Sequence, residues 1–233
     1  MNSTSPASNP PCIGIIKLDT VFPRLVGDVG NPRTFPFPVR YETVSGASPE
    51  RVVKQADPGL LRPFLQAARK LEASGATALA TSCGFLAIYQ QELAQVVNIP
   101  VFSSSLLQIH LAGAIIQKGQ EVGIITADSL SLTLAHFSGL GLAEPPRAVV
   151  GLEEAEEFSA VFLGNRPRLE RRKLEQDMSL ACDELMRRFP GIGAVVLECT
   201  NMPPFAPIIR QKTCLPVFDV VSLIHYAYAV VSG

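Results

Sequence analysis

Thr81-Ser82-Cys83-Gly84-Phe85 and Leu197-Glu198-Cys199-Thr200-Asn201 are matching stretches of a chain that repeats itself. Downstream of each stretch, Ile99-Pro100-Val101-Phe102 matches Leu215-Pro216-Val217-Phe218 at the same spacing as the two cysteines. A duplicated unit that carries a thiol at the same point in each copy can bring two thiols face to face. The repeat therefore predicts two similar halves related by a pseudo-twofold axis.

The length and composition fit this division. The chain has 233 residues, enough for two lobes of about 110 residues that share one body. Its hydrophobic content of 47% and formal net charge of −1 are those of an ordinary globular protein. Because no basic residues are clustered, the composition argues against nucleic acid or an anionic membrane as a partner.

The N-terminal segment from Met1 to Pro11 holds no positive charge and no apolar core, so it does not resemble a signal peptide. No apolar run approaches the roughly 20 residues of a membrane span. The five cysteines include no CxxC pair, and no histidine stands at zinc-ligand spacing. We expect free thiols, no metal site and a cytoplasmic location.

Short β-branched runs alternate with longer helical patterns, which is typical of a parallel α/β sheet. The predicted strands, four in each half, are Cys12–Leu18, Val39–Val44, Ala76–Ala80, Ile99–Phe102, Glu121–Thr126, Arg147–Val150, Ala194–Leu197 and Leu215–Phe218. Helices are predicted after Asp57, Gly84 and Ser104, and one long surface helix from Arg168 to Arg188. The Pro- and Gly-rich segment from Thr20 to Pro38 is predicted to be an extended loop, and a loop of this length is usually functional or disordered.

Cys83 and Cys199 each follow a predicted strand and precede a predicted helix or turn. Ligands of open parallel sheets bind at this edge, where backbone N–H groups and helix dipoles lower the pKa of a thiol from about 8.5. A thiolate on one side of a substrate carbon can remove a proton while a thiol on the other side delivers one. This pair predicts catalysis by proton transfer without a cofactor. Cys12, Cys182 and Cys214 have no matched partner, and we expect them to serve in packing.

Several neighbours of the two cysteines are candidate substrate-binding residues, among them Gly84 and Phe85, which follow Cys83. Thr200 and Asn201 offer a hydroxyl and an amide that suit a carboxylate, and Thr81 and Ser82 hold the matching positions in the first half. Asp19 ends a first strand, as Asp128 does in the second half. It either holds a substrate amine or caps the next segment.

Other polar residues are weaker candidates. Glu198 is either a supporting group or a solvated strand end, and we do not expect it to be a base. Arg24, Arg33 and Arg40 flank the long loop and can bind a distal carboxylate, but surface arginines are common. The histidines lie in apolar helical patterns and are expected to be structural. Nucleotide binding is poorly supported, because no phosphate-binding glycine motif is present.

With two cysteines at duplicated strand ends and Cys199 followed by Thr200, the chain resembles the aspartate/glutamate racemase superfamily from Ile13 to about Tyr226. The resemblance implies two similar α/β lobes with the active site in the cleft between them, and no cofactor. It implies that Cys83 and Cys199 are the acid/base pair and that Thr200 and Asn201 bind substrate. The last helix would then pack on the first lobe, so we expect residues 1–98 plus 216–233 in one lobe and 99–215 in the other.

The chain departs from the amino-acid racemases at two places. Gly84 and Phe85 follow Cys83 where those enzymes usually have Asn-Thr, and Asn201 stands where glutamate racemases have His and aspartate racemases commonly have Glu. Both changes remove polar groups expected around an acidic amino acid. Phe85 and Pro203-Pro204-Phe205 are therefore predicted to line a less polar pocket.

The sequence leaves three functions open. The leading hypothesis is a racemase or epimerase that inverts a carbon next to a carboxylate or carbonyl, in an amino acid such as aspartate or glutamate or in a hydantoin-like compound. The alternative enzyme is a maleate-type cis-trans isomerase, in which one thiolate adds to the double bond. The third is a non-catalytic small-molecule binding protein. Arylmalonate decarboxylases, which also belong to the superfamily, fit least well because they keep a cysteine in only one lobe. Whether the chain forms a homo-oligomer is also left open.

Overall fold

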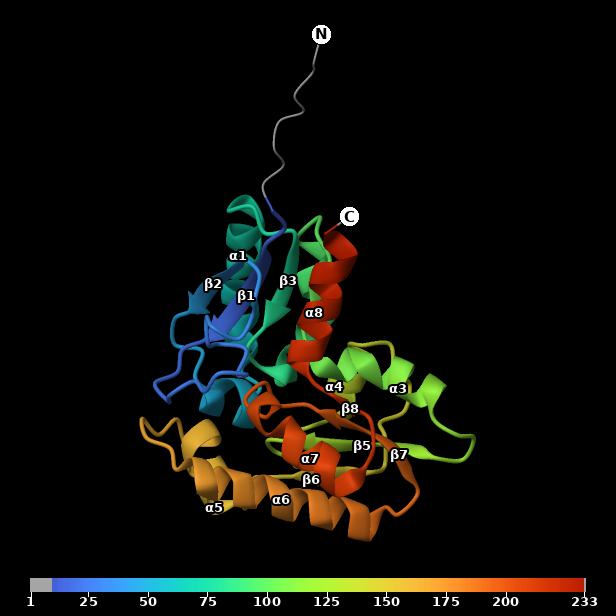
Figure 1. Cartoon of the computed structure of the whole chain (residues 1–233). Helices are drawn as coiled ribbons and strands as arrows, with labels where there is room; N and C mark the ends of the chain where they lie inside the picture. Colours follow the sequence, from blue (N-terminus) through green and yellow to red (C-terminus); the bar gives the residue numbers. More distant parts are fainter. Residues whose placement is uncertain (1–9, 233) are drawn as a thin grey trace.

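The computed structural model describes residues 10–232 and contains two four-stranded parallel sheets (Figure 1). The strand order is β2-β1-β3-β4 in one sheet and β6-β5-β7-β8 in the other. The strands are β1 (Ile13–Leu18), β2 (Val39–Val44), β3 (Ala78–Thr81), β4 (Val101–Phe102), β5 (Glu121–Thr126), β6 (Val149–Gly151), β7 (Ile192–Leu197) and β8 (Val217–Phe218). The identical order confirms the predicted α/β fold of two similar lobes. The N-terminal residues up to 9, most of the segment that does not resemble a signal peptide, lie outside the described part.

The inner strands are continuous apolar runs because helices or the other lobe cover both faces of each sheet. All six residues of β7 are buried, and in β1 only Lys17 is partly exposed. β1 pairs in parallel with β2 and β3, and β5 pairs in parallel with β6 and β7. The carboxyl ends of β1, β3, β5 and β7 therefore lie at one edge of each sheet.

Eight α-helices and six shorter 3₁₀ or π segments connect the strands within the described residues. The α-helices are α1 (Leu61–Ala73), α2 (Gln90–Gln95), α3 (Ile109–Ile115), α4 (Leu134–Ser138), α5 (Glu156–Phe158), α6 (Arg171–Arg188), α7 (Ala206–Thr213) and α8 (Val220–Val231). The shorter segments are η1 (Glu50–Lys54), η2 (Pro58–Leu60), η3 (Gly84–Tyr89), η4 (Ser105–Gln108), η5 (Ser159–Leu163) and η6 (Pro203–Phe205). None of the helices in this part of the chain is long and apolar enough to cross a membrane.

The two lobes exchange the helices that follow their last strands. α3 follows β4 of the first sheet but packs on β5 and β7 of the second, with Ile109 and Ala112 buried against Ile124 and Val196. α8 follows β8 of the second sheet and packs on β3 and β4 of the first (Figure 1). The packing of the last helix on the first lobe agrees with the expectation from the resemblance.

The strand pairing places the lobe boundaries differently from the expected ones at residues 98 and 216. β4 hydrogen-bonds to β3 in the first sheet, and β8 hydrogen-bonds to β7 in the second. Each of these two-residue strands therefore belongs to the sheet of the strand before it, and the crossing between lobes occurs at the helix that follows. The difference arises because a strand this short carries no pattern that identifies its partner.

The segment between β1 and β2 is a loop, as predicted, and it is tied down by its own side chains. The Arg24 guanidinium pairs with Asp28 at 3.0 Å and donates to Thr20 Oγ1 at 2.9 Å. The Asn31 amide donates to the Arg24 carbonyl at 2.8 Å. Because Asp28 is only 2% exposed, this loop is part of the packed body of the protein.

Candidate functional site

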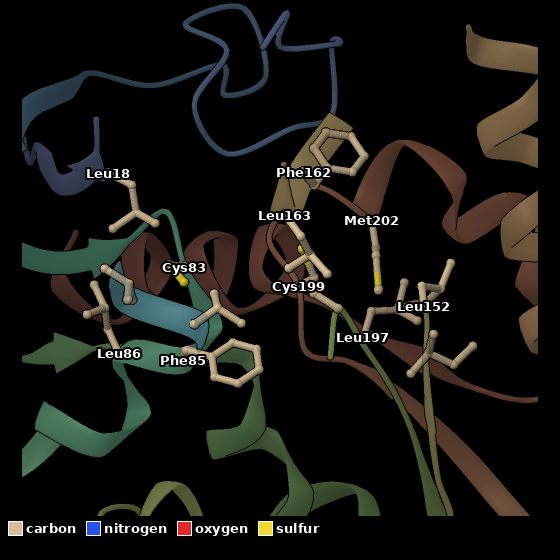
Figure 2. Packing of buried hydrophobic residues seen from close by; sticks show 14 of the residues in the cluster. Leu18, Cys83, Phe85, Leu86, Leu152, Phe162, Leu163, Leu197, Cys199 and Met202 are labelled. Carbon is tan, nitrogen blue, oxygen red and sulfur yellow. The ribbon is translucent and has the colours of Figure 1, made fainter. Parts of the chain in front are cut away.

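Cys83 and Cys199 line one small cavity between the two lobes, with a volume of about 30 Å³. Cys83 follows β3, Cys199 follows β7, and each is 8% exposed. Figure 2 shows both cysteines within one cluster of buried apolar side chains. The main apolar residues of the wall are Leu18, Phe22, Val53, Phe85, Phe162 and Leu163. The polar ones are Thr20, Arg24, Ser82, Glu198, Thr200 and Asn201.

Three wider grooves lie on the surface, and no cysteine of the described residues lines any of them; the smallest, of about 340 Å³, lies beside β2 and α1. One of about 810 Å³ runs beside β4 and β8, and one of about 520 Å³ lies beside α6. The two matched cysteines therefore lie in the small cavity, although the groove beside β4 and β8 has a larger volume. Phe22 of the first lobe packs edge-on against Phe162 of the second, with ring centroids 5.1 Å apart, and this contact helps to close the cavity.

Cys83 precedes η3 as its N-cap residue, as the strand-end prediction requires. Thr81 fixes this turn, because its hydroxyl donates to the Ser103 carbonyl at 2.6 Å and accepts from the Cys83 N–H at 3.4 Å. Burial, followed by the charge of Glu198, raises the pKa of the Cys83 thiol to about 12. The N–H groups of Phe85 and Leu86 act in the opposite direction. The predicted lowering of the thiol pKa is wrong for this cavity, because desolvation outweighs the helix start.

Cys199 has a different set of partners. Its thiol donates to Asn201 Oδ1 at 3.4 Å, and Asn201 Nδ2 in turn donates to Asp28 Oδ2 at 2.6 Å. Burial and the Glu198 charge raise the pKa of Cys199 well above its usual value, although the Asn201 N–H lowers it. A hydrogen bond from S–H to an acceptor also favours the neutral form. Both cysteines are therefore thiols near neutral pH. Cys199 donates to Asn201 and faces one N–H group, whereas Cys83 faces the two N–H groups of Phe85 and Leu86.

Most of the predicted substrate-binding residues reach the cavity. Ser82, Gly84, Phe85, Thr200 and Asn201 all line it. The Ser82 hydroxyl accepts from the Leu18 N–H at 3.0 Å, and Thr200 Oγ1 donates to the Ser82 carbonyl at 2.6 Å. The second of these bonds joins the cysteine turns of the two lobes directly.

Two predicted substrate-binding residues do not line the cavity. Asp19 is exposed, and its carboxylate accepts from the Gly46 N–H at 2.9 Å, so it holds the turn after β2 instead. Thr81 is fully buried and bonded to the backbone of Cys83 and Ser103, so it supports the cysteine turn from behind. A repeat in the sequence places these two residues at strand ends, but it does not specify which way their side chains point.

Glu198 lies in the wall of the cavity, 1% exposed, rather than at a solvated strand end. Its Oε2 accepts from Thr126 Oγ1 at 2.8 Å and from the Ala127 N–H at 3.3 Å. Its Oε1 is buried without a hydrogen-bond partner among residues 10–232. Burial raises the pKa of the Glu198 carboxyl to about 7, with the two hydrogen bonds opposing and Asp128 adding to the rise.

Two further residues of the site, Phe22 and Phe162, were not predicted, and Arg24 was predicted only as a weaker candidate. Phe22 and Arg24 come from the long loop, and Phe162 comes from η5 of the other lobe. The Arg24 guanidinium stacks on the Phe22 ring at 4.4 Å from its centroid. In the sequence, Arg24 was a candidate for binding a distal carboxylate, and the length of the loop marked the loop as functional. No signal pointed to Phe22 or to Phe162.

The match to a family model settles which family this is. The Asp/Glu/Hydantoin racemase model matches residues 41–225, which is more than half of the chain. The chain belongs to the Asp/Glu/hydantoin racemase family. The resemblance seen in the sequence is thereby confirmed.

Curated relatives of this family member are lyases. A dimethylsulfoniopropionate lyase of Durusdinium sp. clade D is 31% identical over 90% of this chain and 71% of its own length. Dimethylsulfoniopropionate lyase 5 of Emiliania huxleyi (strain CCMP1516) is 30% identical over 94% of this chain. The chain spans only 45% of the length of that second protein.

Solved structures agree with the fold. Allantoin racemase from Klebsiella pneumoniae is 16% identical with a TM-score of 0.63, covering 95% of this chain and 86% of that one. Unliganded arylmalonate decarboxylase is 14% identical with a TM-score of 0.60, covering 96% and 93%. At these identities the similarity establishes the two-lobed architecture alone.

Proposed function

We propose that this protein is an enzyme that removes a proton from the carbon next to a carboxylate, with Cys83 as the base. The observation that carries the proposal is that thiols from equivalent strand ends of the two lobes line one enclosed cavity. The N–H groups of Phe85 and Leu86 beside Cys83 favour a thiolate there. Cys199, whose thiol donates to Asn201 Oδ1, serves as the opposing proton donor.

We further propose that the substrate is a 3-sulfoniopropionate such as dimethylsulfoniopropionate. The closed cavity of about 30 Å³ has room for about one water molecule, so the substrate enters when the two lobes move apart. The similarity to two dimethylsulfoniopropionate lyases over at least nine-tenths of the chain supports this choice. In the reaction, the Cys83 thiolate takes a proton from carbon 2, and the C–H electron pair forms the double bond to carbon 3. The C3–S bond breaks with its electrons on sulfur, which gives acrylate and a neutral dialkyl sulfide.

The charges around the cavity suit such a substrate. Arg24 is the one positively charged side chain among the described residues of the wall, and it provides a partner for the carboxylate. The raised pKa of Cys83 requires a compensating positive charge before a thiolate forms at neutral pH. A sulfonium cation beside the thiol supplies that charge, so substrate binding itself favours the reactive form.

The test is to incubate the protein with dimethylsulfoniopropionate and with its form deuterated at carbon 2, and to follow acrylate by proton NMR. We expect acrylate from both, formed more slowly from the deuterated compound because the C–H bond breaks in the reaction. Absence of acrylate at enzyme concentrations near those of the substrate would refute the lyase assignment.

Racemisation is the second candidate, favoured by the matched position of the two thiols. Elimination requires one base, whereas inversion of a carbon requires an acid and a base on opposite faces. Incubation of amino acids, hydantoins and allantoin in heavy water separates the two activities. A racemase inverts one of these compounds while deuterium enters at the inverted carbon, and a lyase leaves all of them unchanged.

A further inference from the structure

The two oxygens of the buried Glu198 carboxyl differ, because one accepts hydrogen bonds from the described part of the protein and the other does not. Oε2 is held by Thr126 and Ala127 at the end of β5, which fixes the position of the group. Oε1 lies so close to Gly84, another cavity residue, that it would overlap a β-carbon there, and it has no hydrogen-bond partner in the part of the chain that the structure describes. A buried carboxylate oxygen without a partner costs about 1–3 kcal/mol, so its retention at the wall of a cavity indicates a ligand contact.

The rest of the wall indicates what kind of ligand group this is. Phe22, Phe85, Phe162 and Leu163 surround the cavity with aromatic and aliphatic surface. The polar oxygens of the wall already accept hydrogen bonds, Ser82 Oγ from Leu18, Thr20 Oγ1 from Arg24 and Asn201 Oδ1 from Cys199. A primary ammonium, which has three N–H donors, would therefore find few free acceptors there. A methylated cation has no N–H or O–H donor and is stabilised by aromatic faces and by one nearby carboxylate.

We propose that Glu198 binds the cationic end of the substrate and selects zwitterions that combine a carboxylate with a methylated onium group. Arg24 then meets the carboxylate and Glu198 meets the onium, with the two thiols in the same cavity. The assignment deepens the proposed function and rests on it for the identity of the onium as a sulfonium.

The contact is linked to pH. The charged and titratable groups around Glu198 are Cys83, Cys199 and Asp128, and Asp128 is paired with Lys54 at 2.5 Å. Both thiols stay protonated near neutrality because their pKa values are raised, and Asp128 stays ionised because its pKa is lowered. Glu198, with a pKa of about 7, is the member of this group that changes charge there. An onium therefore binds more tightly as the pH rises from 6 to 8 and releases a proton as it binds.

The experiment compares two isosteric ligands by isothermal titration calorimetry. 3-(Trimethylammonio)propionate carries the positive charge, and 4,4-dimethylpentanoate replaces it by a neutral tert-butyl group of the same shape. We expect wild type to prefer the cationic ligand by about tenfold or more, equivalent to about 1.4 kcal/mol. Glu198→Gln keeps its affinity for the neutral ligand and loses the preference. Glu154→Gln, which removes an exposed carboxylate outside the cavity wall, keeps the preference.

A cationic preference that survives in Glu198→Gln overturns the assignment. If that variant does not fold, the wild type decides: a ratio of the two affinities that does not change between pH 6 and 8 overturns it equally. A preference lost in Glu198→Gln supports the assignment even where no acrylate is formed from dimethylsulfoniopropionate. Acrylate formation by a wild type without the preference overturns this inference alone and leaves the proposed function standing.

Discussion

At the scale of single residues, the two matched cysteines are alike in position and unlike in partners. Cys83 lies opposite the N–H groups of Phe85 and Leu86, and Cys199 donates to Asn201. Both are buried, and the Glu198 charge disfavours a thiolate on either of them. The site is therefore built to form a thiolate only when a compensating charge is present.

This arrangement predicts a steep pH dependence for alkylation of Cys83 in the free protein. Since its thiol pKa is about 12, the thiolate fraction and the rate rise about tenfold per pH unit between pH 7 and 10, without a plateau. Peptide-resolved mass spectrometry after iodoacetamide treatment measures the rate, with exposed Cys214 as the internal reference for reagent access. A plateau below pH 9 would contradict the raised pKa.

The repeat in the sequence was sufficient to find the cysteines and several of their neighbours, including Phe85 and Asn201. The repeat could not identify Glu198 as a cavity residue, because the position of the Glu198 side chain depends on how Gly84 of the other lobe packs against it. Phe22 and Phe162 were missed for the same reason, since their contact joins segments from different lobes. Asp19 and Thr81 were predicted to bind substrate but do not line the cavity, because a position beside the repeated motif does not fix where a side chain points.

At the scale of elements, the turn after β3 leaves no room for a side chain at Gly84. A methyl group on its α-carbon would overlap Oε1 and the backbone carbonyl of Glu198. The eight strands were predicted to within a few residues because most of them are short runs of apolar or β-branched residues bounded by turn residues. α4 was missed because it has only five residues and is held by the capping contacts of Thr133 and His136 rather than by a periodic pattern.

We expect Gly84→Ala to lower the free energy of unfolding by about 1–3 kcal/mol, the usual cost of overpacking, and to impair activity by displacing Glu198. Gly191→Ala is the matched control, because a methyl group there meets nothing within 4 Å. Urea unfolding of both variants measures the difference. Equal stability of the two would mean that the turn is looser than the contacts indicate.

At the scale of the whole molecule, exchanged helices and a few polar contacts hold the lobes together around the cavity. The Lys54 ammonium of the first lobe pairs with fully buried Asp128 of the second at 2.5 Å. Burial alone would raise the pKa of Asp128, but the bonds from Lys54 and Ser131 lower it below its ordinary value near 3.8. The ionised Asp128 carboxylate therefore stabilises the fold above about pH 3.8, and this stabilisation is lost as the pH falls through the lowered pKa.

Lys54→Met removes the partner of Asp128 and is expected to cost about 1–2 kcal/mol at pH 7, less than for a fully buried pair because Lys54 is 37% exposed. The difference from wild type shrinks as the pH falls through the pKa of Asp128 in the variant, which is higher than in wild type because Lys54 no longer lowers it. Urea unfolding at a series of pH values gives both free energies. A difference that is constant down to pH 3 would exclude the ion pair as its cause.

The central claim is that Cys83 and Cys199 act together on a carbon next to a carboxylate. The most direct measurement is the rate of dimethyl sulfide release from dimethylsulfoniopropionate by wild type, Cys83→Ser and Cys199→Ser, followed by headspace gas chromatography. With Cys83 as the base, we predict that Cys83→Ser loses about 10²–10⁴-fold in kcat, and that Cys199→Ser loses less. Release by Cys83→Ser at the wild-type rate would contradict the account.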